Sequence, residues 1–258
     1  MSDTELPEYD SPPVVEVALT VQFEDSFDMG EATIDALAGA WPEYALERRA
    51  VLRTIGLEPS HIDRPEAGAE LERLWMSAKG GQQVVQVQHD RLTVNWKRDS
   101  LDETYPRFTW LRKFFLDAWH RLSKITAIDL CPDICQVLYV NHIGAESGWH
   151  GISDTSEILA SWRGHTSDEF LPEPEIAAAY LHYHIPDPGQ WLDIDVGPIR
   201  PDENADRVLA MYVSSRGWAA TADLDGALAV LDVAHEWIVR GFTSATTAKA
   251  HQKWGRTR

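Results

Sequence analysis

The order in which two hydrophobic periodicities follow each other constrains the fold of this chain most strongly. An alternating run, Val14–Phe23, precedes a helical segment, three more alternating runs and a longer amphipathic stretch, 108–123. Alternation with a period of two indicates strands, and apolar residues three or four positions apart indicate a helix with one buried face. The second spacing occurs at Phe108, Leu111, Phe115, Ala118 and Leu122. We therefore expect antiparallel strands that are covered by helices.

The same order of elements occurs twice along the chain. In the first half we expect strand 14–23, helix 29–41, strands 72–79, 83–88 and 92–97, and helix 108–123. In the second half we expect strand 136–143, helix 153–162, strands 177–185, 192–196 and 207–215, and helix 224–242. The segment 44–55 fits a strand or a helix, and 59–69 reads as a loop. Asp154 and Glu157 have the spacing of a capping box and predict where the short helix begins.

These elements predict an α+β protein built from two tandem β-α-β-β-β-α units. The units span 12–125 and 134–243, with a disordered N-terminal tail at 1–11 and a C-terminal tail at 244–258. Two such units form either one continuous sheet or two packed sheets, related by a pseudo-twofold axis. The arrangement resembles the TATA-binding-protein-like folds, in which helices cover a curved sheet. That resemblance concerns the fold and carries no function.

Composition restricts the partners and the location that we expect. The chain has 258 residues, 44% of them hydrophobic, and a formal net charge of −18. This charge disfavours duplex DNA and anionic membranes and is compatible with a basic protein partner. No apolar run is long enough to span a bilayer, and residues 1–10 are acidic and polar, unlike a signal peptide. We therefore expect a cytoplasmic protein.

The two cysteines, Cys131 and Cys135, are too few for a disulfide framework or a four-cysteine zinc site. Cys135 lies just before an expected strand and is predicted to be a buried thiol. There are 11 Trp residues against 7 Phe, and some of these indoles are expected to form an exposed adhesive surface.

The first candidate site is a basic segment between a strand and a helix. Its residues are Asn95, Lys97, Arg98, Tyr105 and Arg107. Helix N-termini attract anions, and the guanidinium of an arginine adds several N–H hydrogen-bond donors in one plane. The segment therefore reads either as a phosphate or carboxylate site or as a salt-bridged loop that offsets local acidity.

The second candidate site is the hairpin AYLHYHIPDPGQWLDIDVG at 179–197. His182 and His184 share one face of a strand, and Asp193 and Asp195 share one face of the next. If the register places the pairs opposite each other, two imidazoles and two carboxylates form a divalent-metal shell. The alternative is an exposed polar sheet face, which differs by one residue in register.

No catalytic motif is present: the chain has no Gly-x-Ser-x-Gly, no phosphate-binding glycine loop and no His-Glu-x-x-His. His235 falls on the apolar face of the last helix and is predicted to be a core residue. No catalytic residue is therefore predicted, and no cofactor other than the divalent metal of the hairpin.

Four stretches in this order resemble a family of bacterial proteins of about this length. They are PPVVEVALTVQFE at 12–24, HDRLTVNWKR at 89–98, YPRF at 105–108 and AHEWIVRGFTSATTAKAHQKWG at 234–255. That family occurs sporadically and has no assigned activity, catalytic residues or cofactor. Sporadic occurrence is typical of mobile, defence and toxin–antitoxin genes, which is what the resemblance implies here.

We therefore expect a non-catalytic protein-binding module, such as the antitoxin, immunity or sensor component of a bacterial defence locus. Its partner would be basic or encoded by a neighbouring gene, and the chain itself could form a homo-oligomer. The alternative is an enzyme or a sensor of a small ligand or metal that uses the His/Asp hairpin. In either case, we expect the functional site at the junction between the two halves or among the residues that differ between them.

Overall fold

The computed structural model of the chain describes residues 5–51, 71–78, 80–98, 103–126, 128–162, 170, 172, 174–186, 189–201, 203 and 205–258. Its strands are β1 (Val14–Phe23), β2 (Tyr44–Val51), β3 (Leu71–Ala78), β4 (Gln83–Gln88), β5 (Arg91–Lys97), β6 (Pro132–Ile143), β7 (Ala179–Ile185), β8 (Gln190–Ile199) and β9 (Val208–Trp218). Its helices are α1 (Glu31–Ala40), α2 (Phe108–Leu122), α3 (Thr155–Ile158), α4 (Leu224–Ala245) and α5 (Ala248–Lys253), with 3-10 turns η1 (Ala145–Ser147) and η2 (Ile152–Asp154). The predicted loop at 59–69 lies outside the described residues.

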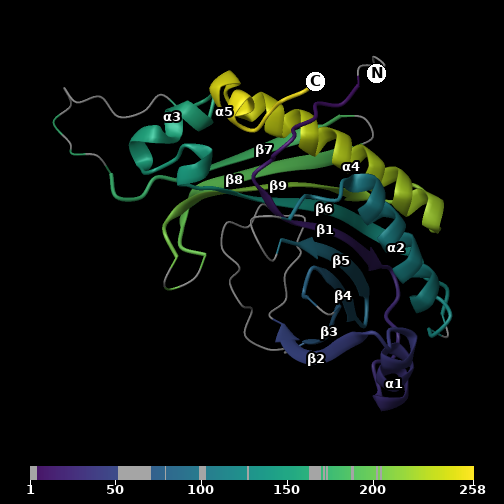
Figure 1. Ribbon diagram of the computed structural model, residues 1–258. Helices are drawn as coiled ribbons and strands as arrows, with labels where there is room; N and C mark the ends of the chain where they lie inside the picture. Colours follow the sequence, from purple (N-terminus) through teal and green to yellow (C-terminus); the bar gives the residue numbers. More distant parts are fainter. Residues whose placement is uncertain are drawn as a thin grey trace.

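The strands form one antiparallel sheet in the order β2-β3-β4-β5-β1-β6-β9-β8-β7. β1 and β6 lie next to each other near the middle, with Leu19 opposite Val137 and Thr20 opposite Gln136. The sheet curves between its β7 end and its β2 end (Figure 1). The predicted α+β class with a large antiparallel sheet is therefore confirmed, and the strands of both halves belong to this one sheet.

The two long helices, α2 and α4, cover the same face of the sheet (Figure 1). α2 packs on β1 and β5, and α4 packs on β6, β8 and β9. Val17, Leu19 and Val21 of β1 are fully buried, as alternation on a half-covered sheet requires. Arg112 of α2 donates two hydrogen bonds, of 2.9 and 3.1 Å, to the carboxylate of Asp232 on α4. The two halves are therefore joined both in the sheet and in the helix layer.

The first half contains one strand more than the predicted unit. The segment that fitted a strand or a helix forms β2, which pairs with β3 from Tyr44–Ala78 to Val51–Leu71. Pairing with β3 supplies partners for the backbone N–H and C=O groups of this segment. Among the described residues, five strands therefore precede α2, whereas four strands lie between α2 and α4.

The helix expected at 153–162 is much shorter than predicted. α3 covers only Thr155–Ile158, and Leu159 forms a bridge with Thr246 instead. The amide of Ala160 donates to the carbonyl of Ala245 at 2.9 Å. The carboxylate of Asp154 accepts a hydrogen bond from the amide of His150 and does not cap α3. Long-range pairing with the chain after α4 therefore ends the helix early, and the predicted capping box does not form.

Residues 5–11 and 244–258, which the sequence assigns to the two tails, contact each other and the helix layer. α4 continues to Ala245, and α5 follows it at 248–253. Tyr9 and Trp254 are buried, at 5% and 2% exposure. Tyr9 pairs with Arg256 in an antiparallel bridge, so the segment before β1 lies beside the segment after α5 (Figure 1).

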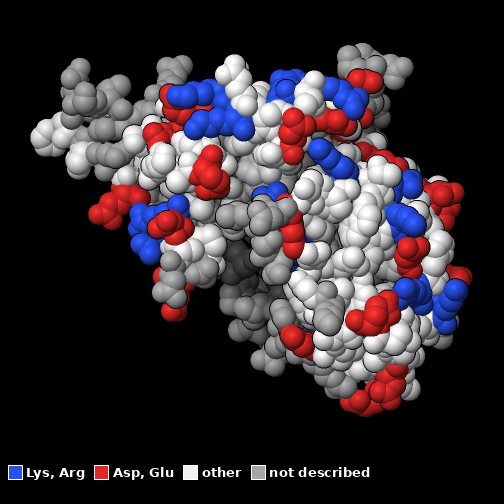
Figure 2. Space-filling model, viewed as in Figure 1, with Lys and Arg blue, Asp and Glu red and all other residues white. Residues whose placement is uncertain are grey.

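No helix in the described part of the chain is both long and apolar enough to cross a lipid bilayer. Acidic and basic side chains are interspersed over the face of the molecule that Figure 2 shows. The net negative charge is therefore spread over this face and not gathered in one acidic patch.

Candidate functional site

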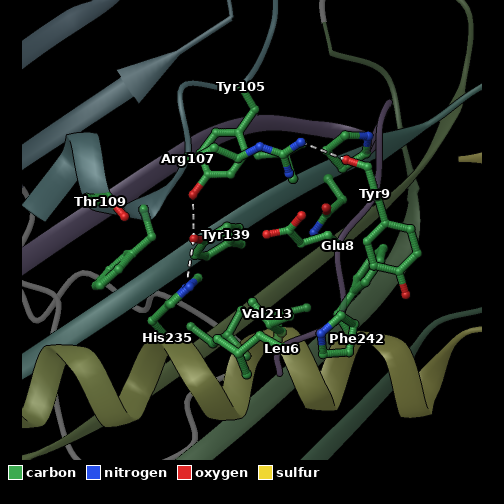
Figure 3. Close-up of a pocket in the computed structure, with 17 residues that line it drawn as sticks. Leu6, Glu8, Tyr9, Tyr105, Arg107, Thr109, Tyr139, Val213, His235 and Phe242 are labelled. Atoms are coloured by element: carbon green, nitrogen blue, oxygen red, sulfur yellow. Dashed lines mark hydrogen bonds between the residues drawn. The ribbon is translucent and has the colours of Figure 1, made fainter. Parts of the chain in front are cut away.

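A cavity of about 490 Å³ lies between the sheet and the helices, where the two halves meet. The segment before β1, the start of α2, the strands β6 and β9, and α4 all contribute to it (Figure 3). Val14, Val213, Ile238 and Phe242 form much of its apolar wall. Its volume falls within the range of about 300–1,000 Å³ that is usual for small-molecule sites.

A β-bulge in β1 shapes one wall of this junction cavity. Val14 is paired with Asn141 and Glu16 with Val140, so Val15 is the extra residue on β1. The bulge places Val14, which is 5% exposed, in the cavity wall, because the extra residue shifts the alternation of β1 by one position. Its neighbour Asn141 is 1% exposed and donates a hydrogen bond to the carbonyl of Met211 at 3.0 Å. A polar amide is thereby fixed in an otherwise apolar wall.

A chain of three polar side chains crosses the junction cavity. The hydroxyl oxygens of Tyr105 and Tyr139 lie 2.6 Å apart, and the Tyr139 oxygen lies 3.1 Å from Nδ1 of His235 (Figure 3). The three residues come from the loop before α2, from β6 and from α4. The ring of His235 also stacks on Phe108, with ring centres 3.9 Å apart. Residues from both halves therefore form a single hydrogen-bonded chain.

All three of these groups are neutral at pH 7, and burial shifts each pKa further toward the neutral form. Loss of water lowers the pKa of His235 to about 4, because the imidazolium is poorly solvated inside the protein. Burial also raises the pKa of Tyr105 and of Tyr139 well above the usual value for a phenol. The hydrogen-bonded chain of Tyr105, Tyr139 and His235 therefore presents two phenol hydroxyls and a neutral imidazole.

Arg107 lies at the rim of the junction cavity in an unusual backbone conformation. Its φ of 74° and ψ of 156° fall in a region that is almost restricted to glycine. The residue is nevertheless an arginine, and its Nη2 donates to the carbonyl oxygen of Tyr9 at 3.1 Å (Figure 3). Backbone strain of this kind is concentrated at functional sites.

The two chain ends close one side of the junction cavity. The amide of Asp10 donates to the carbonyl of Gly255, and the amide of Thr257 donates to the carbonyl of Glu8, at 3.0 and 2.9 Å. The ring of Tyr9 packs edge-on against Phe242, with ring centres 5.7 Å apart. The segment that lines the cavity is therefore held in place by the C-terminal residues.

The structure does not bring the five predicted anion-binding residues together. Asn95 lies on the face of the sheet opposite the helices, where it is bonded to Glu16 at 2.6 Å and to Gln86 at 2.7 Å. Lys97 forms an ion pair with Glu16 at 3.4 Å and lies over the ring of Trp75. These two residues belong to a polar network on the face of the sheet opposite α2 and α4.

The other three residues of that prediction lie nearer the junction cavity. Arg98 donates to the carbonyl of Pro12 at 3.4 Å, while Tyr105 and Arg107 line the cavity itself. The predicted site is therefore divided between the two faces of the sheet.

The predicted metal ligands are only partly gathered. In the β7–β8 register His182 is opposite Asp193, but His184 is opposite Trp191 and Asp195 is opposite Tyr180. Nδ1 of His182 lies 2.6 Å from the Asp193 carboxylate, which also accepts a hydrogen bond from Tyr180 at 2.5 Å.

The guanidinium of Arg216 lies 3.4 Å from the same carboxylate of Asp193. It supplies positive charge where a metal ion would otherwise supply it. Among the residues that the structure describes, no group of three or more His, Cys, Asp or Glu side chains is placed to hold a metal ion.

Sequence reasoning did not select Tyr139 or Asn141, and it placed His235 in the core. His235 is half-buried on α4, beside the buried core residues, and takes part in the polar chain. The available signal was a polar residue on the apolar face of α4. Its partner Tyr139 could not be identified, because it lies 96 positions away in the sequence.

Two comparisons with known proteins give no match. No protein-family model matches the chain, and no curated protein is similar to it in sequence. The site must therefore be interpreted from its own geometry.

Proposed function

We propose that this chain is a non-catalytic protein that binds a small molecule in the junction cavity. The observation that carries the proposal is the chain of Tyr105, Tyr139 and His235 within a largely apolar wall. An apolar cavity with a few convergent polar groups is the usual form of a ligand site. Binding of this kind suits the sensor component that the sequence led us to expect.

The protonation states favour binding over catalysis. A general acid or base works best when its pKa lies near the ambient pH. The pKa of His235 is about 4, so its imidazole is a weak base, and the raised pKa values of both phenols make them weak acids. These groups therefore serve to donate and accept hydrogen bonds.

The strand order supports an origin by duplication. On one side of the sheet centre the order is β1-β5-β4-β3, and on the other side it is β6-β9-β8-β7. In each half the first strand is central and the last strand lies beside it. We infer from this symmetry a pair of β-α-β3-α units arranged as in TATA-binding-protein-like folds, with β2 as an addition. The junction cavity then lies where the two copies meet.

Binding to a protein partner is a second proposal, and exposed aromatic residues favour it. Trp218 is 46% exposed and Tyr212 is 36% exposed, and both belong to β9. Trp191 packs edge-on against Trp218, with ring centres 4.8 Å apart. Tyr and Trp are enriched in protein interfaces. A basic partner, a product of a neighbouring gene or a second copy of this chain would then contact the face of the sheet opposite α2 and α4.

The ligand proposal is tested with a neutral fluorescent probe, N-phenyl-1-naphthylamine. We expect saturable binding of one probe per chain, with a rise in fluorescence. Thr109 lines the mouth of the cavity from the exposed side of α2, so Thr109→Trp places an indole there and should weaken binding at least about tenfold. Asp117→Trp adds the same side chain to an exposed position two turns further along α2 and should leave the affinity unchanged.

A second hollow makes this pair of variants necessary. It has a volume of about 740 Å³ and lies between α4 and the β7–β8 hairpin. Its rim includes Tyr183, which is 46% exposed, so it opens widely to solvent. If Thr109→Trp bound the probe as tightly as the wild type, the junction cavity would not be the site and the proposal would be wrong.

A further inference from the structure

Arg107 carries a positive charge at the junction cavity of a strongly acidic protein. Its guanidinium is bonded to the neutral carbonyl of Tyr9. Within the described residues it forms no ion pair, although the chain has 41 acidic and 23 basic residues. The nearby carboxylate of Glu8 is paired with Arg258 at 2.9 Å. Glu8 also lines the cavity. Because its carboxylate is paired with Arg258, Arg107 brings to a largely apolar cavity a positive charge that has, in the described part of the chain, no carboxylate of its own within ion-pair distance.

The charge of Arg107 acts on the polar chain across the cavity. Burial raises the pKa of Tyr105 and Tyr139, and the Arg107 charge opposes this effect on both phenols. A cation that favours the phenolate form of its neighbours also favours a bound anion in the same place. The positive field of Arg107 thus reaches the point where Tyr105 and Tyr139 present their hydroxyls.

We infer that the junction cavity binds an amphipathic carboxylate, with its anionic group between Arg107 and the Tyr105 hydroxyl and its apolar body against Val213 and Ile238. This inference rests on the proposed function and names its ligand class. An arginine adds a charge-assisted hydrogen bond, which is about twice as strong as a neutral one. The apolar wall supplies the remaining affinity through burial of the ligand body.

The hydrogen-bonded chain provides a donor for this anion. With the proton of His235 on Nδ1, the imidazole donates to the Tyr139 oxygen and Tyr139 donates to the Tyr105 oxygen. The hydroxyl of Tyr105 then donates to the ligand. With the proton on Nε2, every bond in the chain reverses and Tyr105 donates to Tyr139 instead. A bound carboxylate selects the first arrangement, and no proton leaves the protein.

The test compares two probes of similar shape, naphthalene-2-carboxylate and 2-naphthylmethanol, as competitors of N-phenyl-1-naphthylamine. We expect the wild type to bind the carboxylate about tenfold to a hundredfold more tightly than the alcohol, as a hydrogen bond to a charged group implies. Arg107→Gly removes the guanidinium and accepts the positive φ, so it should abolish the preference and retain binding of the alcohol. Lys113→Ala removes an exposed charge from the same helix and should retain the preference.

The outcomes separate the inference from the function on which it rests. Equal affinity of the wild type for both probes, or an unchanged preference in Arg107→Gly, would overturn the carboxylate inference. If the alcohol still displaced the fluorescent probe and Thr109→Trp still blocked it, the cavity would remain a ligand site. If neither probe bound and Thr109→Trp had no effect, the proposed function itself would fail, and the inference with it.

Discussion

Replacement of Arg107 by glycine and by alanine measures the backbone strain at the cavity rim. At a φ of 74° and a ψ of 156°, any residue with a Cβ stores about 1–3 kcal/mol of strain. Both variants lose the hydrogen bond to Tyr9, which contributes about 0.5–1.5 kcal/mol. Only glycine also relieves the strain, although its greater freedom in the unfolded chain costs about 0.5–1 kcal/mol. Arg107→Gly should therefore be more stable than Arg107→Ala by about 1 kcal/mol.

Equilibrium urea unfolding, followed by tryptophan fluorescence and by circular dichroism, gives the free energy of unfolding of each variant. The matched control is the same pair of substitutions at Asp117, an exposed position inside α2. There glycine should be less stable than alanine by about 1 kcal/mol, as in any helix interior. Glycine should thus be the more stable variant at position 107, and alanine the more stable variant at position 117. Equal stability at position 107, or a more stable alanine variant, would refute the strain argument.

Three further predictions concern buried groups. Because His235 has a pKa of about 4 when folded and about 6.5 when unfolded, the unfolded chain binds more protons between these values. Wild-type stability should then fall by about 2 kcal/mol from pH 7 to pH 5 relative to His235→Phe, and parallel pH profiles would contradict this. Burial raises the pKa of Cys135 to about 12, so a thiol reagent at pH 8 should modify the half-buried Cys131 alone; modification of both thiols in the native protein would refute it. Tyr139→Phe breaks one buried and one partly buried hydrogen bond and should lower the urea-unfolding free energy by about 1–3 kcal/mol, whereas a loss below about 0.5 kcal/mol would show that these hydrogen bonds do not stabilise the fold.

Elements with strong periodicity could be predicted almost to the residue. Alternation marks β1 at 14–23, and the apolar stripe of α2 gives a helix that begins at Phe108. These patterns are local, because the spacing of apolar residues within each element determines which of its faces is buried. The α+β class follows from them directly.

Elements whose conformation depends on a distant partner could not be predicted. β2 is a strand because β3 lies beside it. The helix at 155–158 is short because Leu159 pairs with Thr246, 87 positions further along the chain. The bulge at Val15 also arises from pairing with β6, and no feature of the local sequence marks it.

The candidate site, too, could be predicted only where its residues lie close together in the sequence. Tyr105 and Arg107 were selected because they lie close together before a helix, and both line the cavity. The other residues of the polar chain come from β6 and α4, and only the sheet register and the packing of α4 bring them together. The His/Asp hairpin was correctly placed on adjacent strands, and its register sets His182 opposite Asp193 but His184 opposite Trp191 and Asp195 opposite Tyr180.

The central claim is that the junction cavity binds a small molecule, and a bromine-labelled ligand locates the site directly. Crystals of the full chain would be soaked with 2-bromonaphthalene, and diffraction data would be collected at the bromine absorption edge. We expect an anomalous peak inside the cavity, among Val213, Ile238 and Phe242. A bromine peak only in the open hollow between α4 and β7, or an empty cavity in saturated crystals, would contradict the account.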